Sequence, residues 1–109
     1  MSIGSAQLKT ECNGGVLTAY VSGEIDHHTS KELRNKIDAC LGELSPDKLT
    51  IDLSGVTFMD SSGLGLIMGR FRLTESAHIN FSVKGVPPRA AQMFSMAGLE
   101  RIIDFEQEK

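Results

Sequence analysis

Apolar residues in the first part of the chain recur with the spacing of β-strands. Residues 7–12 and 16–22 flank Asn13-Gly14-Gly15, which tolerates positive φ in a tight turn. Between residues 17 and 21 every second residue is apolar, so these side chains share one face. The pattern predicts an antiparallel β-hairpin at the start of the chain.

After the hairpin, three segments of the chain have the features of helices. Thr29 stands three residues before Glu32, the spacing of a capping box, and the first helix is expected to end near residues 42–46. A third helix begins at Pro87-Pro88 and ends before Gly98. The second helix covers residues 63–75, and its expected buried face is Leu64, Ile67, Met68 and Phe71.

Short β-favouring segments at residues 49–53, 79–84 and 102–105 separate and follow these helices. The order is therefore β-β-α-β-α-β-α-β, which predicts an α/β fold with a mixed, mostly parallel sheet and helices on at least one face. The sequence contains no linker, internal repeat or low-complexity tract. Residues 1–109 are expected to form a single domain.

Composition narrows the classes of partner and site. The 11 Lys and Arg residues against 14 Asp and Glu give a net charge of -3, and no basic cluster suggests binding to nucleic acid. The sequence has no leader pattern and no apolar run of the roughly 18 residues that a membrane span needs, so we expect a cytoplasmic protein without membrane association. Cys12 and Cys40 have no third soft ligand at metal-site spacing, and we expect both thiols to be buried or half-buried.

Asp60-Ser61-Ser62-Gly63 is the main candidate site, because it joins a strand to an apolar-faced helix. A helix N-terminus carries roughly half a positive charge and unpaired N–H groups, so an added phosphate is favoured there. Phosphorylation of Ser61 or Ser62 is thus compatible with the fold. Helix capping explains the same residue types, and both interpretations stay open. The site lacks a G-x-S-x-G elbow and a nearby histidine base, which argues against an enzyme.

The glycines that follow do not match a nucleotide-binding loop. Met68 occupies the position of the third glycine of a dinucleotide fingerprint, and no Gly-Lys-Ser/Thr sequence occurs. Gly65 and Gly69 instead form a smooth stripe on the helix, along which the backbone of the sheet or of a partner can approach. Upstream, Asp26 and the histidines that follow it are expected in a solvent-facing loop. Adjacent histidine side chains diverge, so no metal site is predicted there.

Residues 23–29, 54–65 and 89–103 together resemble the STAS family of anti-sigma factor antagonists. The resemblance implies a regulatory binding module that needs no cofactor and is not an enzyme. Its unphosphorylated form binds an anti-sigma factor and releases the sigma factor. The anti-sigma factor is also a serine kinase that uses ATP to phosphorylate the antagonist, and a serine phosphatase reverses the modification.

Carried over by position, the resemblance makes Ser61 the phosphorylated residue and implies a partner-binding surface of Asp26, Asp60, Ser61, Ser62 and Gly63. It further implies control of sporulation transcription, with a stress-response pathway as an alternative. The glycine-rich helix start leaves a small nucleotide-binding protein as a second alternative, from a different class of function. A phosphoserine adds about 1.5 to 2 negative charges beside Asp60. We therefore expect a local electrostatic switch on a rigid domain.

Overall fold

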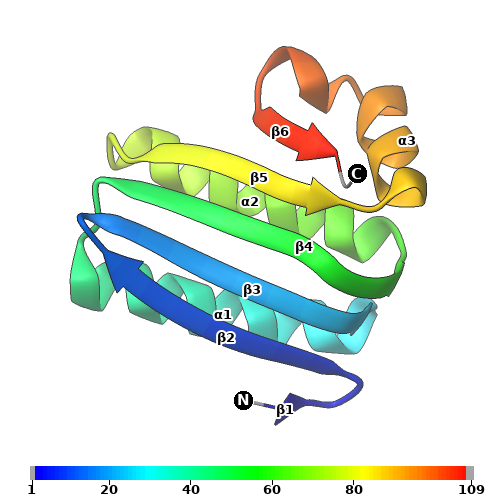
Figure 1. Cartoon of the computed structure of the whole chain (residues 1–109), viewed down its shortest axis with the longest axis horizontal. Coiled ribbons are helices and arrows are strands. Elements are labelled where there is room, and N and C mark those ends of the chain that lie inside the picture. Colours follow the sequence, from blue (N-terminus) through cyan, green and yellow to red (C-terminus); the bar gives the residue numbers. More distant parts are fainter. Residues whose placement is uncertain (1, 108–109) are drawn as a thin grey trace.

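The computed structural model describes residues 2–107, which form one six-stranded sheet with the spatial order β1-β2-β3-β4-β5-β6 (Figure 1). β1, β2 and β3 are antiparallel neighbours, whereas β3 through β6 are parallel. The strands are β1 (Ser2–Ile3), β2 (Ala6–Asn13), β3 (Val16–Ile25), β4 (Lys48–Met59), β5 (Asn80–Val86) and β6 (Asp104–Gln107). The predicted α/β class and mixed, mostly parallel sheet are confirmed, and β1 is one short strand more than predicted.

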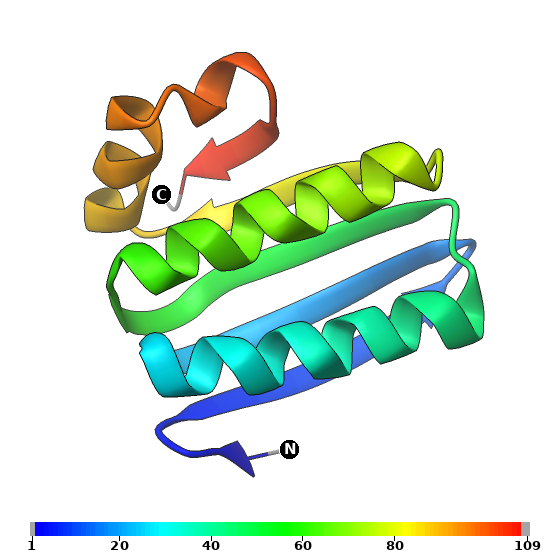
Figure 2. The ribbon, with the colours of Figure 1, turned by 180° about the vertical axis from the view of Figure 1, so that it is seen from behind.

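Three helices connect the parallel strands: α1 (His27–Leu44), α2 (Ser61–Ser76) and α3 (Pro88–Met96). A 3-10 turn, η1 (Leu99–Arg101), precedes β6. Figure 2 shows α1 and α2 side by side on one face of the sheet and running in the same direction. Because each of these two helices directly follows a parallel strand, both begin at the same edge of the sheet. The third helix packs beside β6, where the rings of Phe94 and Phe105 meet edge to face with centroids 5.5 Å apart.

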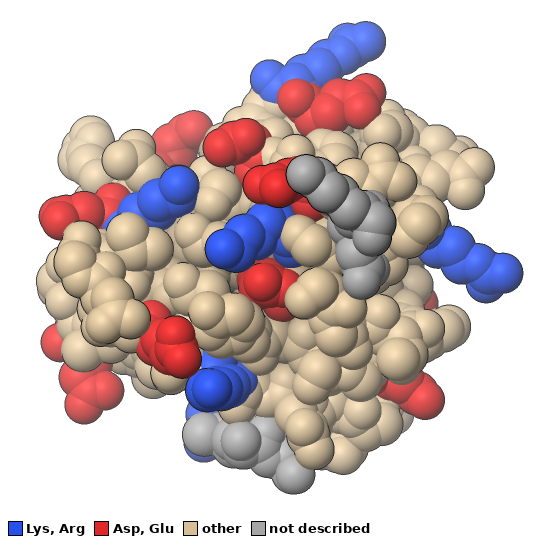
Figure 3. Space-filling model, in the orientation of Figure 1, with Lys and Arg blue, Asp and Glu red and all other residues tan. Residues whose placement is uncertain are grey.

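The hydrophobic core lies between the sheet and the two long helices. Alternate residues of β3 and β4 point toward the helices, and each fully buried aliphatic side chain contributes about 1.5 to 3 kcal/mol. These buried residues include Leu17, Ala19, Val21, Leu49, Ile51 and Leu53 from the strands and Leu33, Ile37, Leu41 and Ile67 from the helices. The opposite face of the central strands is polar. Figure 3 shows that acidic and basic side chains lie interspersed on it.

The hairpin forms at the predicted turn, where Gly14 and Gly15 have φ of 57° and 79°. The predicted start of the first helix is wrong, because Asp26 is the N-cap of α1 and Thr29 is the third helical residue. The two residues exchange hydrogen bonds as a capping box, so the two histidines between them belong to the first helical turn and not to a loop.

β4 continues six residues beyond the predicted end at Leu53. The extension is stabilised by pairing with the end of β3, up to the Ile25–Met59 pair. The last strand is also displaced: β6 begins at Asp104, and Ile102, predicted as part of it, lies in a turn with 52% of its surface exposed.

The buried face of α2 is rotated from the predicted one. Only Ile67 of the four predicted residues is fully buried, while the other three are half-buried against the core. Arg70 takes a buried position instead, because its Nε lies 2.8 Å from Oδ1 of Asp38 on α1. Cys40 is half-buried as predicted, but Cys12 is exposed because every side chain of β2 after Leu8 faces solvent.

Candidate functional site

The starts of α1 and α2 are neighbours at one edge of the sheet. The last residues of β3 and β4, Ile25 and Met59, are paired across the two strands. The backbone N–H of Asp60 then donates to the carbonyl oxygen of Ile25 at 3.2 Å. Asp26 and Asp60 therefore begin two adjacent helices, and the five residues of the predicted partner-binding surface all lie at this edge.

Asp26 is held by the first turn of α1. Its Oδ1 accepts the backbone N–H groups of His28 and Thr29, both at 2.9 Å, and its own N–H donates to the Thr29 hydroxyl at 2.9 Å. The N–H of Thr29 and, to a smaller extent, that of His28 lower the pKa of the Asp26 carboxyl, because both hydrogen bonds favour the charged form. The site thus carries a fixed negative charge at neutral pH.

Asp60 has the equivalent position on α2. Its Oδ1 accepts the N–H of Ser62 at 2.8 Å, and its carbonyl oxygen accepts the N–H of Gly63 at 3.0 Å. The predicted capping role of Asp60 is confirmed. Its carboxylate lies at the helix end where negative charge is favoured.

Ser61 is the first residue of α2 and is exposed. Within residues 2–107, its hydroxyl makes no hydrogen bond, whereas the backbone of Ser62 is held by the cap and its side chain is half-buried. The hydroxyl of Ser61 is therefore available to a partner or an enzyme without breaking an internal contact. It lies between two capped helix starts and is exposed to solvent.

The glycines of α2 have different surroundings. Gly63 is buried, and a Cβ there would overlap the side chain of Met59 at the end of β4, so glycine is needed for this close approach. At Gly65 and Gly69 a Cβ would meet nothing within 4 Å. The sheet does not approach the Gly65–Gly69 stripe, and approach by a partner stays a prediction.

A groove of about 360 Å³ passes between α1 and α2 beside Ser62 and over Gly65 and Gly69. Its cationic lining comprises Lys31, Arg34 and Arg70. The acidic helix starts and this basic groove lie next to one another. The surface around Ser61 therefore offers both signs of charge within a short distance.

Two residues at this end were not predicted from the sequence. Phe58, three residues before Ser61, is 51% exposed and pairs with Glu24 across the strands. Arg70 has a side chain only 7% exposed and is paired with Asp38, and its burial lowers the pKa of the guanidinium. If the predicted strand had been extended beyond residue 53, the alternation of inward and outward side chains would have placed Phe58 on the outward face. The buried arginine has no signal in the sequence.

Two other kinds of site, a metal centre and a membrane-spanning helix, are absent from residues 2–107. In residues 2–107 no three His, Cys, Asp or Glu side chains are grouped so as to hold a metal ion. The helices in this range are too short or too polar to cross a bilayer. What the edge around Ser61 offers is thus an exposed hydroxyl, two fixed carboxylates and an exposed aromatic ring, a set suited to contact with another macromolecule.

Comparison with protein families identifies this chain: the model of the STAS domain matches residues 7–109. The chain belongs to the STAS domain family. STAS antagonists of the kind that it resembles are regulatory binding proteins and not enzymes.

Two relatives of this STAS chain are anti-sigma factor antagonists. The anti-sigma F factor antagonist of Paenibacillus polymyxa is 36% identical over 97 residues, which cover 89% of this chain and 83% of the relative. The anti-sigma-B factor antagonist of Bacillus subtilis (strain 168) is 34% identical over 92 residues, covering 84% of this chain and 83% of the relative.

The solved structures of the anti-sigma factor antagonist SpoIIAA match the fold of this STAS chain. The unphosphorylated form superposes with a TM-score of 0.78 at 25% identity, over 94% of this chain and 90% of the other. The Bacillus protein in the phosphorylated form superposes with a TM-score of 0.74 at 25% identity, over 94% and 93% of the two chains.

Proposed function

We propose that this STAS protein is an anti-sigma factor antagonist: its unphosphorylated form binds an anti-sigma factor and thereby releases a sigma factor. The two relatives named as antagonists each match more than four fifths of this chain, which supports the assignment. The observation that carries it is the exposed, unbonded hydroxyl of Ser61 between the capped starts of α1 and α2. The partner-binding surface is proposed to comprise Asp26, Asp60, Ser61, Ser62 and Gly63.

Phosphorylation of Ser61 is proposed to switch this binding off. The anti-sigma factor acts as the kinase: the Ser61 oxygen attacks the γ-phosphorus of ATP, ADP leaves, and the hydroxyl proton passes to a base of the kinase. A serine phosphatase restores the hydroxyl by hydrolysis. Structures of the related SpoIIAA in both phosphorylation states support such a cycle here.

The physical basis of the switch is local. The phosphate adds about 1.5 to 2 negative charges, which the N-terminus of α2 tolerates. A carboxylate of the partner about 4 Å away experiences a repulsion of up to about 4 kcal/mol per unit charge at an effective dielectric constant of 20, equivalent to roughly three decades in affinity. No rearrangement of the sheet is needed.

The test combines mass mapping and binding. The protein is incubated with ATP, alone and with a candidate anti-sigma kinase, and the expected product is one phosphoryl group on Ser61 that forms only with the kinase. Ser61→Ala removes the acceptor, and Ser62→Ala is the matched control that retains it. By calorimetry, Ser61→Ala should bind the anti-sigma factor as tightly as the wild type, whereas Ser61→Asp should bind more weakly. Equal affinities of the two variants would exclude the switch.

The pathway is proposed to be sporulation, with a stress response as the alternative that the anti-sigma-B relatives favour. Identities of 36% and 34% do not separate the two. Affinity for purified anti-sigma F and anti-sigma B factors, measured side by side, is the experiment that does. Preference for the anti-sigma B factor would move the protein to the stress response.

A further inference from the structure

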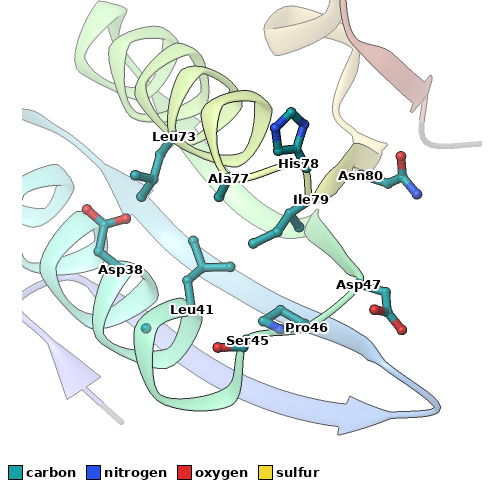
Figure 4. Close-up of a pocket in the computed structure, with 11 residues that line it drawn as sticks. Asp38, Leu41, Ser45, Pro46, Asp47, Leu73, Ala77, His78, Ile79 and Asn80 are labelled. Atoms are coloured by element: carbon teal, nitrogen blue, oxygen red, sulfur yellow. The ribbon is translucent and has the colours of Figure 1, made fainter.

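The surface between α1 and α2 is divided into two unlike halves by the contact between Arg70 and Asp38. The half next to Ser61 is the basic groove, which is lined by residues between 27 and 34 of α1 and between 62 and 70 of α2. The other half is a cavity of about 690 Å³, across which three apolar side chains point toward one another (Figure 4): Leu41, Leu73 and Ile79. Within residues 2–107, no Lys or Arg lines that cavity. Between the two helices, cationic side chains are thus confined to the half that adjoins the proposed partner-binding surface.

Two cations of the basic groove have no partner. Lys31 and Arg34 are exposed, and within residues 2–107 neither forms an ion pair. Because they are three residues apart on α1, their side chains lie on the same face of the helix. No Asp or Glu is among the described residues that line the groove. The exposed part of the groove therefore carries a positive charge that the protein itself does not neutralise.

The third cation, Arg70, has unused hydrogen-bond donors. Its side chain is only 7% exposed, and its Nε lies 2.8 Å from Oδ1 of Asp38. Within residues 2–107, its Nη1 and Nη2 groups make no hydrogen bond. Burial lowers the pKa of this guanidinium, Asp38 raises it, and Arg34 lowers it again, because the two positive charges repel each other. A carboxylate bound in the groove would satisfy these donors and relieve that repulsion.

The glycines of the basic groove leave room for the backbone of a partner. Gly65 and Gly69 are four residues apart and lie on one face of α2. Both line the groove, and a Cβ at either position would meet nothing within 4 Å. At a rise of about 1.5 Å per residue, Gly69 lies about 12 Å from Ser61 along the helix. The groove therefore extends the accessible surface by about two helical turns beyond Ser61.

We propose that the anti-sigma factor places an acidic segment in the basic groove, with its backbone over the two glycines and its carboxylates against Lys31, Arg34 and Arg70. This inference rests on the proposed function, because it assigns a second contact to the same partner. Charge complementarity carries it, since carboxylates are favoured in the groove and disfavoured beside Asp26 and Asp60. The partner then presents basic groups to the two helix starts and acidic groups to the groove, and this pattern fixes the direction in which it lies along α1 and α2.

The first experiment is an amide NMR titration of the full, unphosphorylated chain with purified anti-sigma F or anti-sigma B factor, in the absence of ATP. Shift changes are expected at Gly65 and Gly69 as well as at Ser61. Changes at Ser61 without changes at the two glycines would leave the proposed function intact and overturn the acidic segment. No binding to either factor would refute both. Changes at the glycines that follow the concentration of the chain alone would assign the groove to a second copy of the chain, and the proposal would again be overturned.

Charge reversal tests the electrostatic part by calorimetry. Lys31→Glu and Arg34→Glu should each weaken binding of the anti-sigma factor about tenfold, because each replaces an attraction with a repulsion. Lys36→Glu is the matched control: Lys36 is exposed on α1 and does not line the groove, and its reversal changes the net charge by the same amount. The control should change the affinity by less than about twofold, because salt screens charges outside the contact. Equal losses in Lys31→Glu and Lys36→Glu would show attraction by overall charge and refute the site.

Filling the groove tests the approach of the partner's backbone. Gly69→Gln adds an uncharged side chain to the groove and should weaken binding about tenfold or more. Gly42→Gln is the matched control, because Gly42 is a helical glycine of α1 that lines the far cavity and whose Cβ would likewise meet nothing within 4 Å. Neither variant should lower the urea midpoint, since glutamine favours a helix more than glycine does. If Gly69→Gln binds the anti-sigma factor as tightly as Gly42→Gln does, no segment of the partner occupies the groove.

Discussion

Substituting alanine for the glycines of α2 should change stability with opposite signs along a single helix. Gly63 lies in the first turn, and its missing side chain makes room for Met59 of β4. Gly65 and Gly69 lie on the same helix, where an added Cβ would meet nothing within 4 Å. The three Gly→Ala variants make the same chemical change in different surroundings.

The magnitudes follow from two terms. Alanine in place of a helical glycine stabilises by about 1 kcal/mol through helix propensity and reduced freedom of the unfolded chain. At Gly63 the new methyl group would overlap Cγ and Sδ of Met59, and overpacking of this kind costs about 1 to 3 kcal/mol. We therefore expect Gly63→Ala to be neutral or destabilising by up to about 2 kcal/mol, and Gly65→Ala and Gly69→Ala to stabilise by up to about 1 kcal/mol each.

Urea unfolding followed by far-ultraviolet circular dichroism measures these differences, and thermal unfolding checks them with a shift of about 4 °C per kcal/mol for a chain of this size. If Gly63→Ala is stabilised as much as Gly65→Ala, the contact with Met59 does not constrain the start of α2. If Gly65→Ala or Gly69→Ala is destabilised, the open space above the stripe is not present in solution.

Three further predictions concern charge and exposure. Because the pKa of Asp26 is lowered, its carboxylate stabilises the fold above the ordinary pKa of 3.8, and this contribution is lost as the pH falls through the lowered pKa. Asp26→Asn can still cap the helix but cannot titrate. The free energy of unfolding of this variant, measured by urea unfolding, should therefore fall less steeply at acid pH than that of the wild type. Phe58→Ala should weaken binding of the anti-sigma factor by about 1 to 2 kcal/mol in calorimetry while changing unfolding by less than about 0.5 kcal/mol. Arg70→Met should destabilise the fold by about 1 to 3 kcal/mol, because it leaves the carboxylate of Asp38 without its ion-pair partner. The loss is limited because the Asp38 side chain is 33% exposed. The control Arg34→Met, on the exposed face of α1, should have little effect on the urea midpoint.

Local sequence chemistry explains the parts of the fold that were predicted. The turn at Gly14 and Gly15 needs positive φ at two successive residues, and few other pairs supply it. Alternation in β3 and helical period in α1 likewise depend only on neighbouring residues. The end of β4 was missed because Ser54-Gly55 suggests a turn, while pairing of Gly55 with Ser22 on β3 keeps the strand extended. Tertiary pairing overrides local preference at that point.

In the candidate site, too, the features that depend on local sequence could be predicted, and those that depend on tertiary contacts could not. Asp60 as a cap could be inferred from its place before a helix, whereas the proximity of Asp26 depends on β3 and β4 being parallel neighbours. The assignment of the capping box to Thr29 and Glu32 failed because the competing pair, Asp26 and Thr29, has the same spacing. Burial of Arg70 depends on Asp38 of another helix, so no local pattern reveals it.

Capping and partner contact are combined in the same few residues, which determines how their roles can be separated. Loss of the Asp60 side chain removes the hydrogen bond that it accepts from the N–H of Ser62. Weaker partner binding by that variant could then come either from fraying of the helix start or from loss of a direct contact with the partner. Ser61 differs, because it is exposed and within residues 2–107 its hydroxyl makes no hydrogen bond. A change of affinity in Ser61→Ala or Ser61→Asp that leaves the urea midpoint unchanged therefore reports on recognition alone. The exposed, unbonded hydroxyl that makes Ser61 the proposed modification site also allows binding and folding to be measured independently at this position.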